Sequence, residues 1–114
     1  MELLAVYGTL KKGHPNHRVI GNAEYLGSCA IEGWAMYSLG YFPCIVPMKL
    51  SSRVVVEVYA LDDLAAADRL EGYPNFYDRT KVRTSYGEAW VYFMREAPDG
   101  AKKVRSGNWS RVSN

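Results

Sequence analysis

Cysteine is scarce in this sequence, and nothing around the cysteines indicates a disulfide framework. Cys29 and Cys44 are the only two, and since no other feature indicates secretion, we expect both to be reduced thiols. Together with His14 and His17 they lack the closely paired spacing of zinc ligands. The sequence therefore predicts no metal site and no cofactor.

Long apolar runs and a strong excess of charge are also missing. No run approaches the roughly 20 apolar residues that span a bilayer. Residues 1–5 carry an acid and lack the basic start of a signal peptide, so we expect a cytoplasmic protein with no membrane partner. The net charge of +2 is too small to indicate nucleic-acid binding by itself.

The composition that remains is that of a β-rich globular chain. Its 114 residues, 48% of them hydrophobic, predict one domain over residues 1–114 with a sizeable core. Nine tyrosines, three tryptophans and ten glycines suit strands joined by many turns. Short apolar or β-branched runs predict strands over 3–6, 24–26, 29–37 (with Gly33 as a bulge or bend), 44–46 and 53–59, and a hairpin of 77–84 with 88–94.

Helices are expected at two places only. Pro15 and Gly21 bracket a short helix, and residues 62–70 form the clearer one. In the second, Asp62 is the expected N-cap, and Gly72 followed by Pro74 ends the helix. The residues expected on its buried face are Leu61, Leu64 and Ala65. The strands outnumber these helices and have turn-length connections, which predicts an α+β fold: a small, mostly antiparallel, barrel-like sheet with a few flanking short helices.

The stretch around which the chain is organised follows the first strand. Gly8 directly after a buried strand lets N–H groups face a ligand, although a plain tight turn is the simpler interpretation. Gly8 and Gly13 enclose four residues, as in a phosphate-binding loop. His14 and Pro15 then stand where such a loop needs lysine and a hydroxyl residue, which excludes a P-loop nucleoside triphosphatase.

Glu71 is the second distinctive residue, because it stands at the C-terminal end of the expected helix. The helix dipole disfavours a carboxylate there, so the side chain is either exposed and solvated or faces a pocket. In a pocket, burial and the helix terminus would both raise its pKa, as an acid/base group requires. No second carboxylate is an obvious companion, which favours a mechanism with one carboxylate.

With both stretches considered, the sequence resembles the gamma-glutamylcyclotransferase-like family. Residues 6–17 read VYGTLKKGHPNH and are similar to the gamma-glutamylamine cyclotransferase branch, with its Tyr-Gly-Thr-Leu-Lys start and Gly-x-Pro-Asn-His run. The ending SGNW is similar to the family's Ser-Gly-Asp-Trp, with Asn108 where aspartate is usual. Further similar stretches are 40–43, 54–59, Leu70-Glu71 and Tyr77-x-Arg79.

The resemblance implies a reaction and a set of residues. A γ-glutamyl amine or peptide closes on itself and releases 5-oxoproline and a free amine, with no cofactor. The family's catalytic glutamate falls on Glu71 and its substrate loop on Tyr7, Gly8, Thr9 and Leu10. We expect Tyr7 to add a hydroxyl donor and Tyr77 to line the pocket, whose wall includes residues 41–43 and 73–77. The only partner implied is the small substrate, and the chain is expected to be a monomer or a weak homodimer.

Two alternatives remain open at this point. The same fold can serve as a non-catalytic binding or regulatory module that recognises a γ-glutamyl-like ligand. The basic tail can also be a nucleic-acid contact, although a solvated, frayed end is the simpler interpretation and no nucleic acid is expected as a partner. The cations of that tail are Lys102, Lys103, Arg105 and Arg111.

Overall fold

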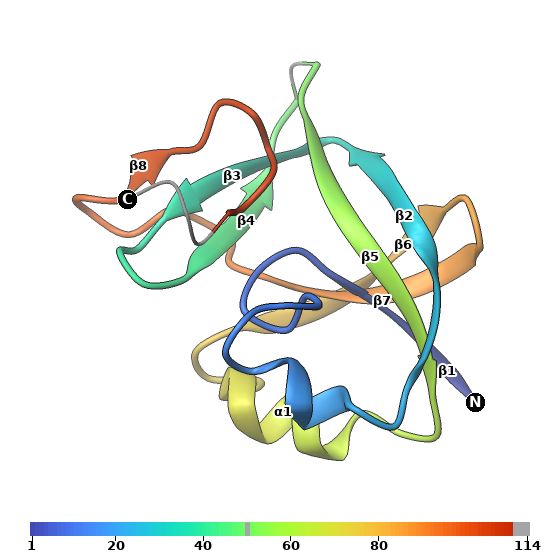
Figure 1. The fold of residues 1–114 in the computed structure, drawn as a ribbon. Coiled ribbons are helices and arrows are strands. Elements are labelled where there is room, and N and C mark those ends of the chain that lie inside the picture. Colours follow the sequence, from blue (N-terminus) through green and yellow to red (C-terminus); the bar gives the residue numbers. More distant parts are fainter. Residues whose placement is uncertain (50, 111–114) are drawn as a thin grey trace.

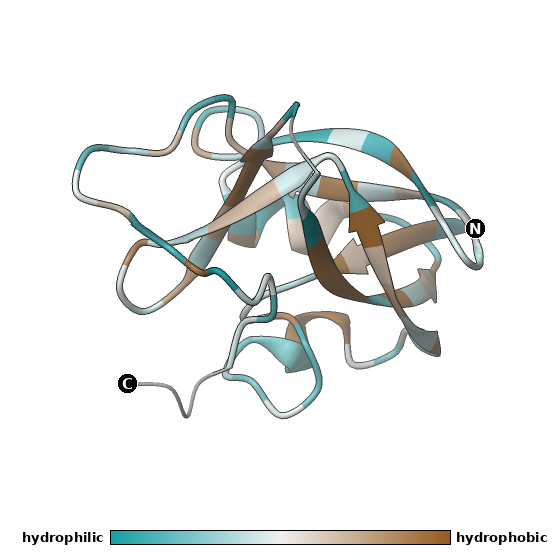
Figure 2. Cartoon of the chain, turned by 90° about the horizontal axis from the view of Figure 1, so that it is seen from above, coloured by the Kyte–Doolittle hydropathy of each residue, from teal (hydrophilic) through white to brown (hydrophobic). Residues whose placement is uncertain are grey.

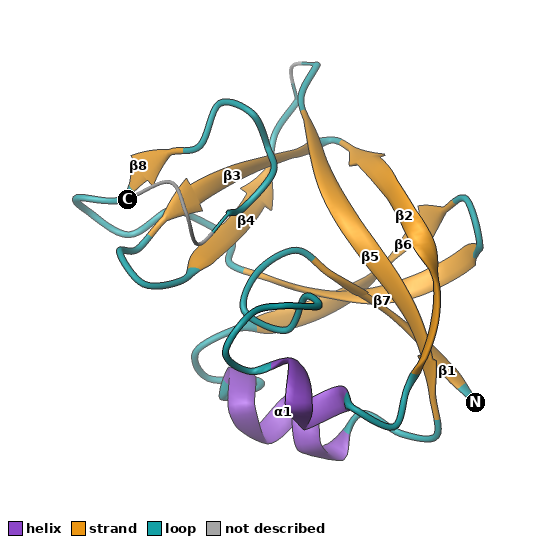
Figure 3. Ribbon diagram, viewed as in Figure 1, coloured by secondary structure: helices purple, strands orange, loops and turns teal. Residues whose placement is uncertain are grey.

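Two sheets and two short helices make up the computed structural model, which describes residues 1–49 and 51–110 (Figures 1 and 3). The helices lie together at one end of the molecule, and strands form the rest (Figure 3). The strands are β1 (Glu2–Val6), β2 (Glu24–Glu32), β3 (Trp34–Ser38), β4 (Pro43–Pro47), β5 (Arg53–Leu61), β6 (Asp78–Thr84), β7 (Gly87–Phe93) and β8 (Lys102–Lys103), and the helices are the 3₁₀ helix η1 (His17–Ile20) and α1 (Ala65–Glu71).

The larger sheet has the strand order β2-β5-β1-β7-β6. Strand β1 pairs antiparallel with β5 and parallel with β7, and the other pairs of this sheet are antiparallel. The sheet curls until its edges meet, where the Tyr86 hydroxyl donates to the Ser28 carbonyl oxygen at 3.5 Å. The expected α+β class with a mostly antiparallel sheet is confirmed, and the sheet is barrel-like only in this loose sense, because no ladder between β2 and β6 closes the described strands.

The smaller sheet, β4-β3-β8, shows where the strand prediction was wrong. Gly33 was expected as a bulge or bend inside one strand over 29–37. Instead it adopts φ +89°, in the region that favours glycine, and separates β2 of the larger sheet from β3 of the smaller one. Strand β2 in turn starts at Glu24, and its irregular pairing lies between Tyr25 and Gly27. A Met94 N–H donor to the Ile45 carbonyl (2.9 Å) connects the two sheets.

Strand β1 is buried on both of its faces, which places its C-terminal end inside the molecule. Leu4 and Val6 pack in the cluster that includes the helices, whereas Ala5 and Tyr7 pack in the cluster on the other face. Alternate residues of β5, Val54 to Val58, join the second cluster, as the two-residue period of a strand requires. In Figure 2 the hydrophobic colour accordingly runs along strands of the molecule, whereas the loops are mostly hydrophilic or pale.

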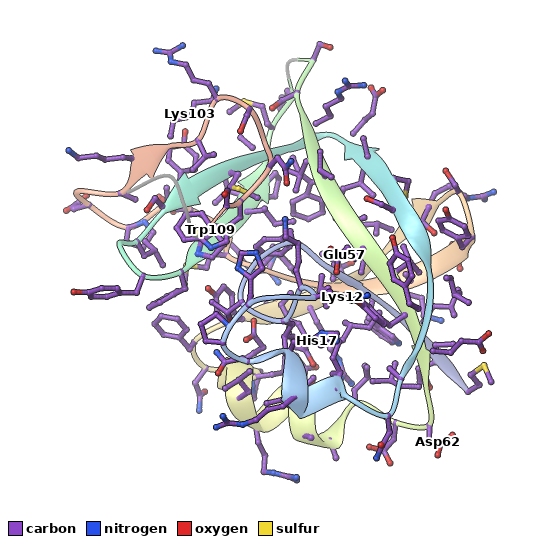
Figure 4. The ribbon with its side chains drawn as sticks, viewed as in Figure 1. Lys12, His17, Glu57, Asp62, Lys103 and Trp109 are labelled. Carbon is purple, nitrogen blue, oxygen red and sulfur yellow. The ribbon has the colours of Figure 1, made fainter. Side chains whose placement is uncertain are left out.

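The start of α1 differs from the sequence prediction. Asp62 is exposed and is not the N-cap (Figure 4); Leu64 occupies that position, and Asp63 Oδ1 accepts from the Ala65 N–H at 2.9 Å. Because the helix begins three residues later than expected, its buried side runs from Leu64 to Ala67, and Ala65 is exposed. Of the predicted face, Leu61 and Leu64 do pack in the core, and Ala65 was wrong.

The end of α1 agrees with the prediction. Gly72 is the C-cap in the left-handed conformation (φ 65°), and the Tyr73 N–H donates to the Asp68 carbonyl at 3.0 Å. The shorter helix η1 contacts α1 (Figure 1). With seven residues in α1, no helix of residues 1–49 and 51–110 is long and apolar enough to cross a membrane.

The C-terminal segment is held to the body of the protein as far as residue 110. Val104 N–H donates to the Met36 carbonyl, and Val55 N–H donates to the Gly107 carbonyl, both at 2.8 Å. The expectation of a frayed end was therefore wrong for residues 101–110. Arg111, the last cation of the basic tail, lies outside the described residues.

Candidate active site

A cavity of about 330 Å³ lies between the loop after β1, the end of α1 and the β3–β4 connection. The sequence analysis singled out residues from three separate parts of the chain for one site. The structure brings all of them to the wall of this cavity: Tyr7, Gly8, Thr9, Leu10, Glu71 and Tyr77.

In the loop after β1 the backbone carbonyl groups are used by the protein, whereas the N–H groups remain as donors. The carbonyls of Gly8 and Thr9 accept from the N–H groups of Lys11 and Asn16, each at 3.0 Å. None of the described residues accepts a hydrogen bond from the N–H groups of residues 8–10. Clustered N–H groups of this kind form a site for an anionic oxygen.

A side-chain contact extends this donor set. Asn16 Nδ2 donates to Thr9 Oγ1 at 3.0 Å, which uses an oxygen lone pair and leaves the hydroxyl proton available. His17 Nδ1 lies 2.8 Å from the Leu10 carbonyl and therefore carries a proton, since a carbonyl only accepts. His17 and Glu57 flank the same loop, and Glu57 Oε1 accepts from the Lys12 N–H at 2.9 Å (Figure 4). The loop is thus fixed from several sides.

Gly8 is required by close packing at the start of β4. A Cβ atom at this position would lie 2.7 Å from Pro43 Cγ, closer than non-bonded carbon atoms approach. The same Pro43 accepts a hydrogen bond from the Tyr77 hydroxyl at 2.6 Å through its carbonyl. The loop, β4 and the segment before β6 therefore meet at one point of the cavity wall.

Glu71 is the only residue with a carboxylate or cationic side chain among the described residues that line the cavity. Burial raises the pKa of its carboxyl group from 4.5 to about 7. No hydrogen bond joins this carboxylate to another of the described residues, so its oxygen atoms are available to a ligand. The expectation of a raised pKa is confirmed, with burial as its cause.

Three buried tyrosines surround Glu71, and their hydroxyl protons are used within the protein. Tyr7 donates to the Tyr92 carbonyl at 2.8 Å, which corrects the expectation that its hydroxyl proton is available to a ligand. Tyr77 donates to Pro43, and Tyr92 donates to Asp68 Oδ1 at 2.7 Å. Burial, and in addition the nearby Glu71 charge, raise the pKa of all three tyrosines above 10, so they remain neutral hydroxyls.

Asp68 and Arg79 brace the end of α1 against the sheet. Both carboxylate oxygens of Asp68, one helical turn before Glu71, accept from Arg79 Nη1 at 2.7 and 2.6 Å. The guanidinium carbon lies 4.4 Å from the Tyr73 ring centroid and 4.7 Å from that of Trp90. This brace fixes the helix turn that carries Glu71.

The sequence analysis missed some lining residues, and residues 73–75, which it placed in the wall, do not line the cavity. Tyr92 lines the cavity, but its place in the middle of an apolar strand run gave no signal of this. Asn16 also lines it, and here the Gly-x-Pro-Asn-His run was a usable signal. Residues 41–43 and 76–77 form part of the wall as expected, whereas Tyr73 packs on Arg79 instead.

Comparisons with known proteins show the family of the chain. A model of the family described as "Gamma-glutamyl cyclotransferase, AIG2-like" matches residues 4–111. "Gamma-glutamylcyclotransferase family protein YtfP" of Escherichia coli (strain K12) is 38% identical over 106 residues, covering 91% of this chain and 92% of that protein.

Solved structures show the same similarity. PH0828 from Pyrococcus horikoshii has a TM-score of 0.82 at 32% identity, covering 98% of this chain and 92% of its own. An AIG2-like protein from Mus musculus has a TM-score of 0.74 at 29% identity, with 87% and 81% covered. Allophanate hydrolase of Kluyveromyces lactis shares only the fold, at 21% identity and a TM-score of 0.77. The chain belongs to the AIG2-like gamma-glutamylcyclotransferase family.

Proposed function

We propose that the chain is a cyclotransferase of the gamma-glutamylamine type, which converts a small γ-glutamyl amine or peptide into 5-oxoproline and a free amine. The observation that carries this proposal is Glu71. It is a single carboxylate without a hydrogen-bond partner among the described residues, and its pKa is about 7 in a cavity with N–H donors on another wall. The family membership of the chain supports a reaction of this class.

The loop after β1 is the proposed site for the substrate's α-carboxylate. The N–H groups of residues 8–10 and the Thr9 hydroxyl are the donors available for it. No lysine or arginine among the described residues lines the cavity, so binding by backbone dipoles takes the place of a salt bridge. Holding this end fixes the γ-glutamyl chain in a folded form, with its α-amine near its own γ-carbonyl.

The reaction then needs one proton carrier. The neutral α-amine attacks the γ-carbonyl carbon and forms the ring C–N bond, while the bond from this carbon to the leaving nitrogen breaks. The Glu71 carboxylate accepts one proton from the attacking nitrogen and gives it to the leaving nitrogen. Reactant and products balance without water, so no other reactant is required.

The raised pKa of Glu71 suits both halves of this transfer. A carboxyl group with a pKa of about 7 is a stronger base than an ordinary glutamate and still donates a proton near neutral pH. The attacking amine has a pKa of about 8 in solution, close to that of its proton acceptor. An exposed carboxylate with an ordinary pKa would be a weaker base, by roughly the difference between its pKa and that of Glu71.

The test is release of 5-oxoproline from a panel of γ-glutamyl amides and dipeptides. Wild type is compared with Glu71→Gln, which keeps the shape of the side chain and removes the proton carrier. Glu88→Gln, an exposed glutamate of β7 outside the cavity, is the matched control. We expect product from wild type and the control, and a loss of roughly 10²–10⁴-fold in Glu71→Gln.

Two outcomes would contradict the proposal. Full activity of Glu71→Gln, with product still formed, would remove the assigned role of Glu71. Binding of a γ-glutamyl ligand by calorimetry, with no product from any member of the panel, would favour the non-catalytic binding module. In that case Glu71→Gln would change the affinity alone.

A further inference from the structure

The residues that line the cavity differ in exposure, and the exposed and buried ones also differ in chemistry. Four lining residues are exposed to solvent, and all four are apolar or aromatic: Pro15, Tyr41, Leu70 and Phe76. Tyr41 is 95% exposed and Phe76 53%. Exposed apolar side chains gathered at one opening, instead of scattered singly, are typical of a surface that contacts a ligand.

The inner end of the cavity is occupied by the groups that the proposed reaction uses. Tyr7, Tyr77 and Tyr92 are buried there around Glu71, and the loop donors belong to the same end. If the γ-glutamyl group lies with its carboxylate on the loop, its leaving nitrogen must be near Glu71. The substituent on that nitrogen then extends toward the exposed rim.

An unbroken row of rings connects the inner end to the rim. The Phe76 ring lies 5.0 Å from the Tyr77 ring and 6.0 Å from the Phe42 ring, centroid to centroid, and both contacts are edge-to-face. Tyr77 is buried and Phe76 is exposed, so their contact joins the inner end to the rim, and the half-buried Phe42 packs on the other side of Phe76.

The rim offers nothing to a charged leaving group. Apart from Glu71 no aspartate, glutamate, lysine, arginine or histidine among the described residues lines the cavity. A second carboxylate on the substrate would therefore lose water without gaining a cationic partner. An ammonium group would have only exposed ring faces to contact, and such contacts contribute little.

We propose that this rim selects an uncharged, apolar leaving amine, with an arylalkyl amine as the best fit, and that Tyr41 and Phe76 are the specificity-determining residues. This inference rests on the proposed cyclotransferase function. It names the class of leaving group, which family membership and the catalytic residue do not determine. Contact of one aromatic group with an apolar wall is sufficient for roughly tenfold discrimination.

The experiment measures kcat/KM for 5-oxoproline release from four substrates: the γ-glutamyl derivatives of methylamine, benzylamine, alanine and the lysine ε-amine. We expect benzylamide to exceed each of the other three by about tenfold or more. The methylamide has no group that reaches the rim, so it reports the proposed reaction alone.

Variants then locate the selection. Tyr41→Ala and, separately, Phe76→Ala are expected to lower the ratio of benzylamide to methylamide kcat/KM by about threefold to tenfold. Tyr25→Ala is the matched control, since Tyr25 is an aromatic residue of β2 that is 53% exposed and lies outside the cavity. It should leave the ratio unchanged. Tyr41 is almost fully exposed, so its variant tests the proposal even if Phe76→Ala is poorly folded.

The two failures are distinguishable. Glu71-dependent product from methylamide, with alanine or lysine derivatives equal to or better than benzylamide, would overturn the rim proposal and leave the cyclotransferase function standing. An unchanged ratio in both rim variants would overturn it as well. Absence of product from all four substrates would contradict the proposed function itself, and the rim proposal with it.

Discussion

The inner end and the rim of the cavity both carry aromatic side chains, but they differ in exposure and in their polar groups. At the inner end, three tyrosine hydroxyls are tied into hydrogen bonds with the protein, and one carboxylate is left without a partner among the described residues. At the rim the side chains are apolar or aromatic and make no such bond with another described residue, and Tyr41 is almost fully exposed. In the proposed reaction the chemistry is therefore assigned to one group with fixed surroundings, and substrate selection to a surface that can change without disturbing them.

The largest expected effect is on folding stability, which the burial of the ionisable Glu71 makes dependent on pH. Its pKa rises from 4.5 to about 7 on folding, so the folded state holds its proton more tightly than the unfolded state. Stability is therefore lost as pH rises through this window, by about 3 kcal/mol in total. Glu71→Gln should be more stable than wild type by about that amount at pH 8 and by close to nothing at pH 4, measured by urea unfolding. A gain that is equal at both values of pH would contradict the burial of an ionisable carboxyl.

The next largest effect is expected from a substitution that displaces the backbone at the inner end. Gly8→Ala places a methyl group 2.7 Å from Pro43 Cγ, so the loop or β4 must shift. A displacement of the donors by a fraction of an ångström to 1 Å is expected to lower kcat/KM by about 10²-fold. Gly13→Ala is the control for loss of a loop glycine near the site, because open space surrounds its new Cβ. Its positive φ adds backbone strain but no contact with β4. Equal activity of Gly8→Ala and wild type would contradict the assigned role of the loop.

A smaller effect is expected from loosening the brace behind Glu71. Arg79→Met removes the donor to Asp68 while retaining an apolar stem between Tyr73 and Trp90. The end of α1 then loses one of its supports, and we expect kcat to fall by about tenfold, with a smaller change in KM. Arg79→Lys should recover part of the activity. An effect on KM alone would show that Arg79 acts on binding and does not position Glu71.

The smallest effect is expected at the C-terminal segment, outside the cavity. The buried Lys11 ammonium donates to Asn108 Oδ1 at 3.1 Å and to the Trp109 carbonyl at 2.8 Å, and burial lowers the pKa of Lys11. Asn108→Asp supplies a carboxylate partner and should stabilise the fold by roughly 1 kcal/mol, with little change in activity. The gain should vanish in a Lys11→Met background, as a double-mutant cycle can measure. A gain that persists there would exclude this contact as its source.

Features that depend on neighbouring residues could be predicted from the sequence, whereas features that depend on distant residues could not. The stop of α1 at Gly72 and the hairpin of β6 and β7 depend on neighbouring residues, and both were predicted within a residue or two. The break at Gly33 depends on which distant strands pair with each side of it, and no local pattern carries that information. The late start of α1 was also missed, although Asp63, which accepts from the Ala65 N–H, adjoins the predicted cap Asp62.

The site shows the same division. Gly8 and Glu71 were identified because each stands at the end of an element, where an N–H group or a side chain is free to face a cavity, and Tyr7 was identified through the family resemblance. Tyr92 was missed because it stands within a strand, and only the fold shows that its side of β7 borders the cavity. The hydrogen bond that uses the Tyr7 hydroxyl proton joins it to that same unpredicted residue.

The most direct test of the central claim is the pKa of Glu71 in the free protein, measured by ¹³C NMR titration of a labelled carboxyl group and assigned with Glu71→Gln. A midpoint at about 7 is predicted, and the acid limb of kcat/KM should then follow the same midpoint. A midpoint near 4.5 would contradict the account, because an ordinary solvated glutamate at this position would be neither buried nor suited to carry the proton between the two nitrogens.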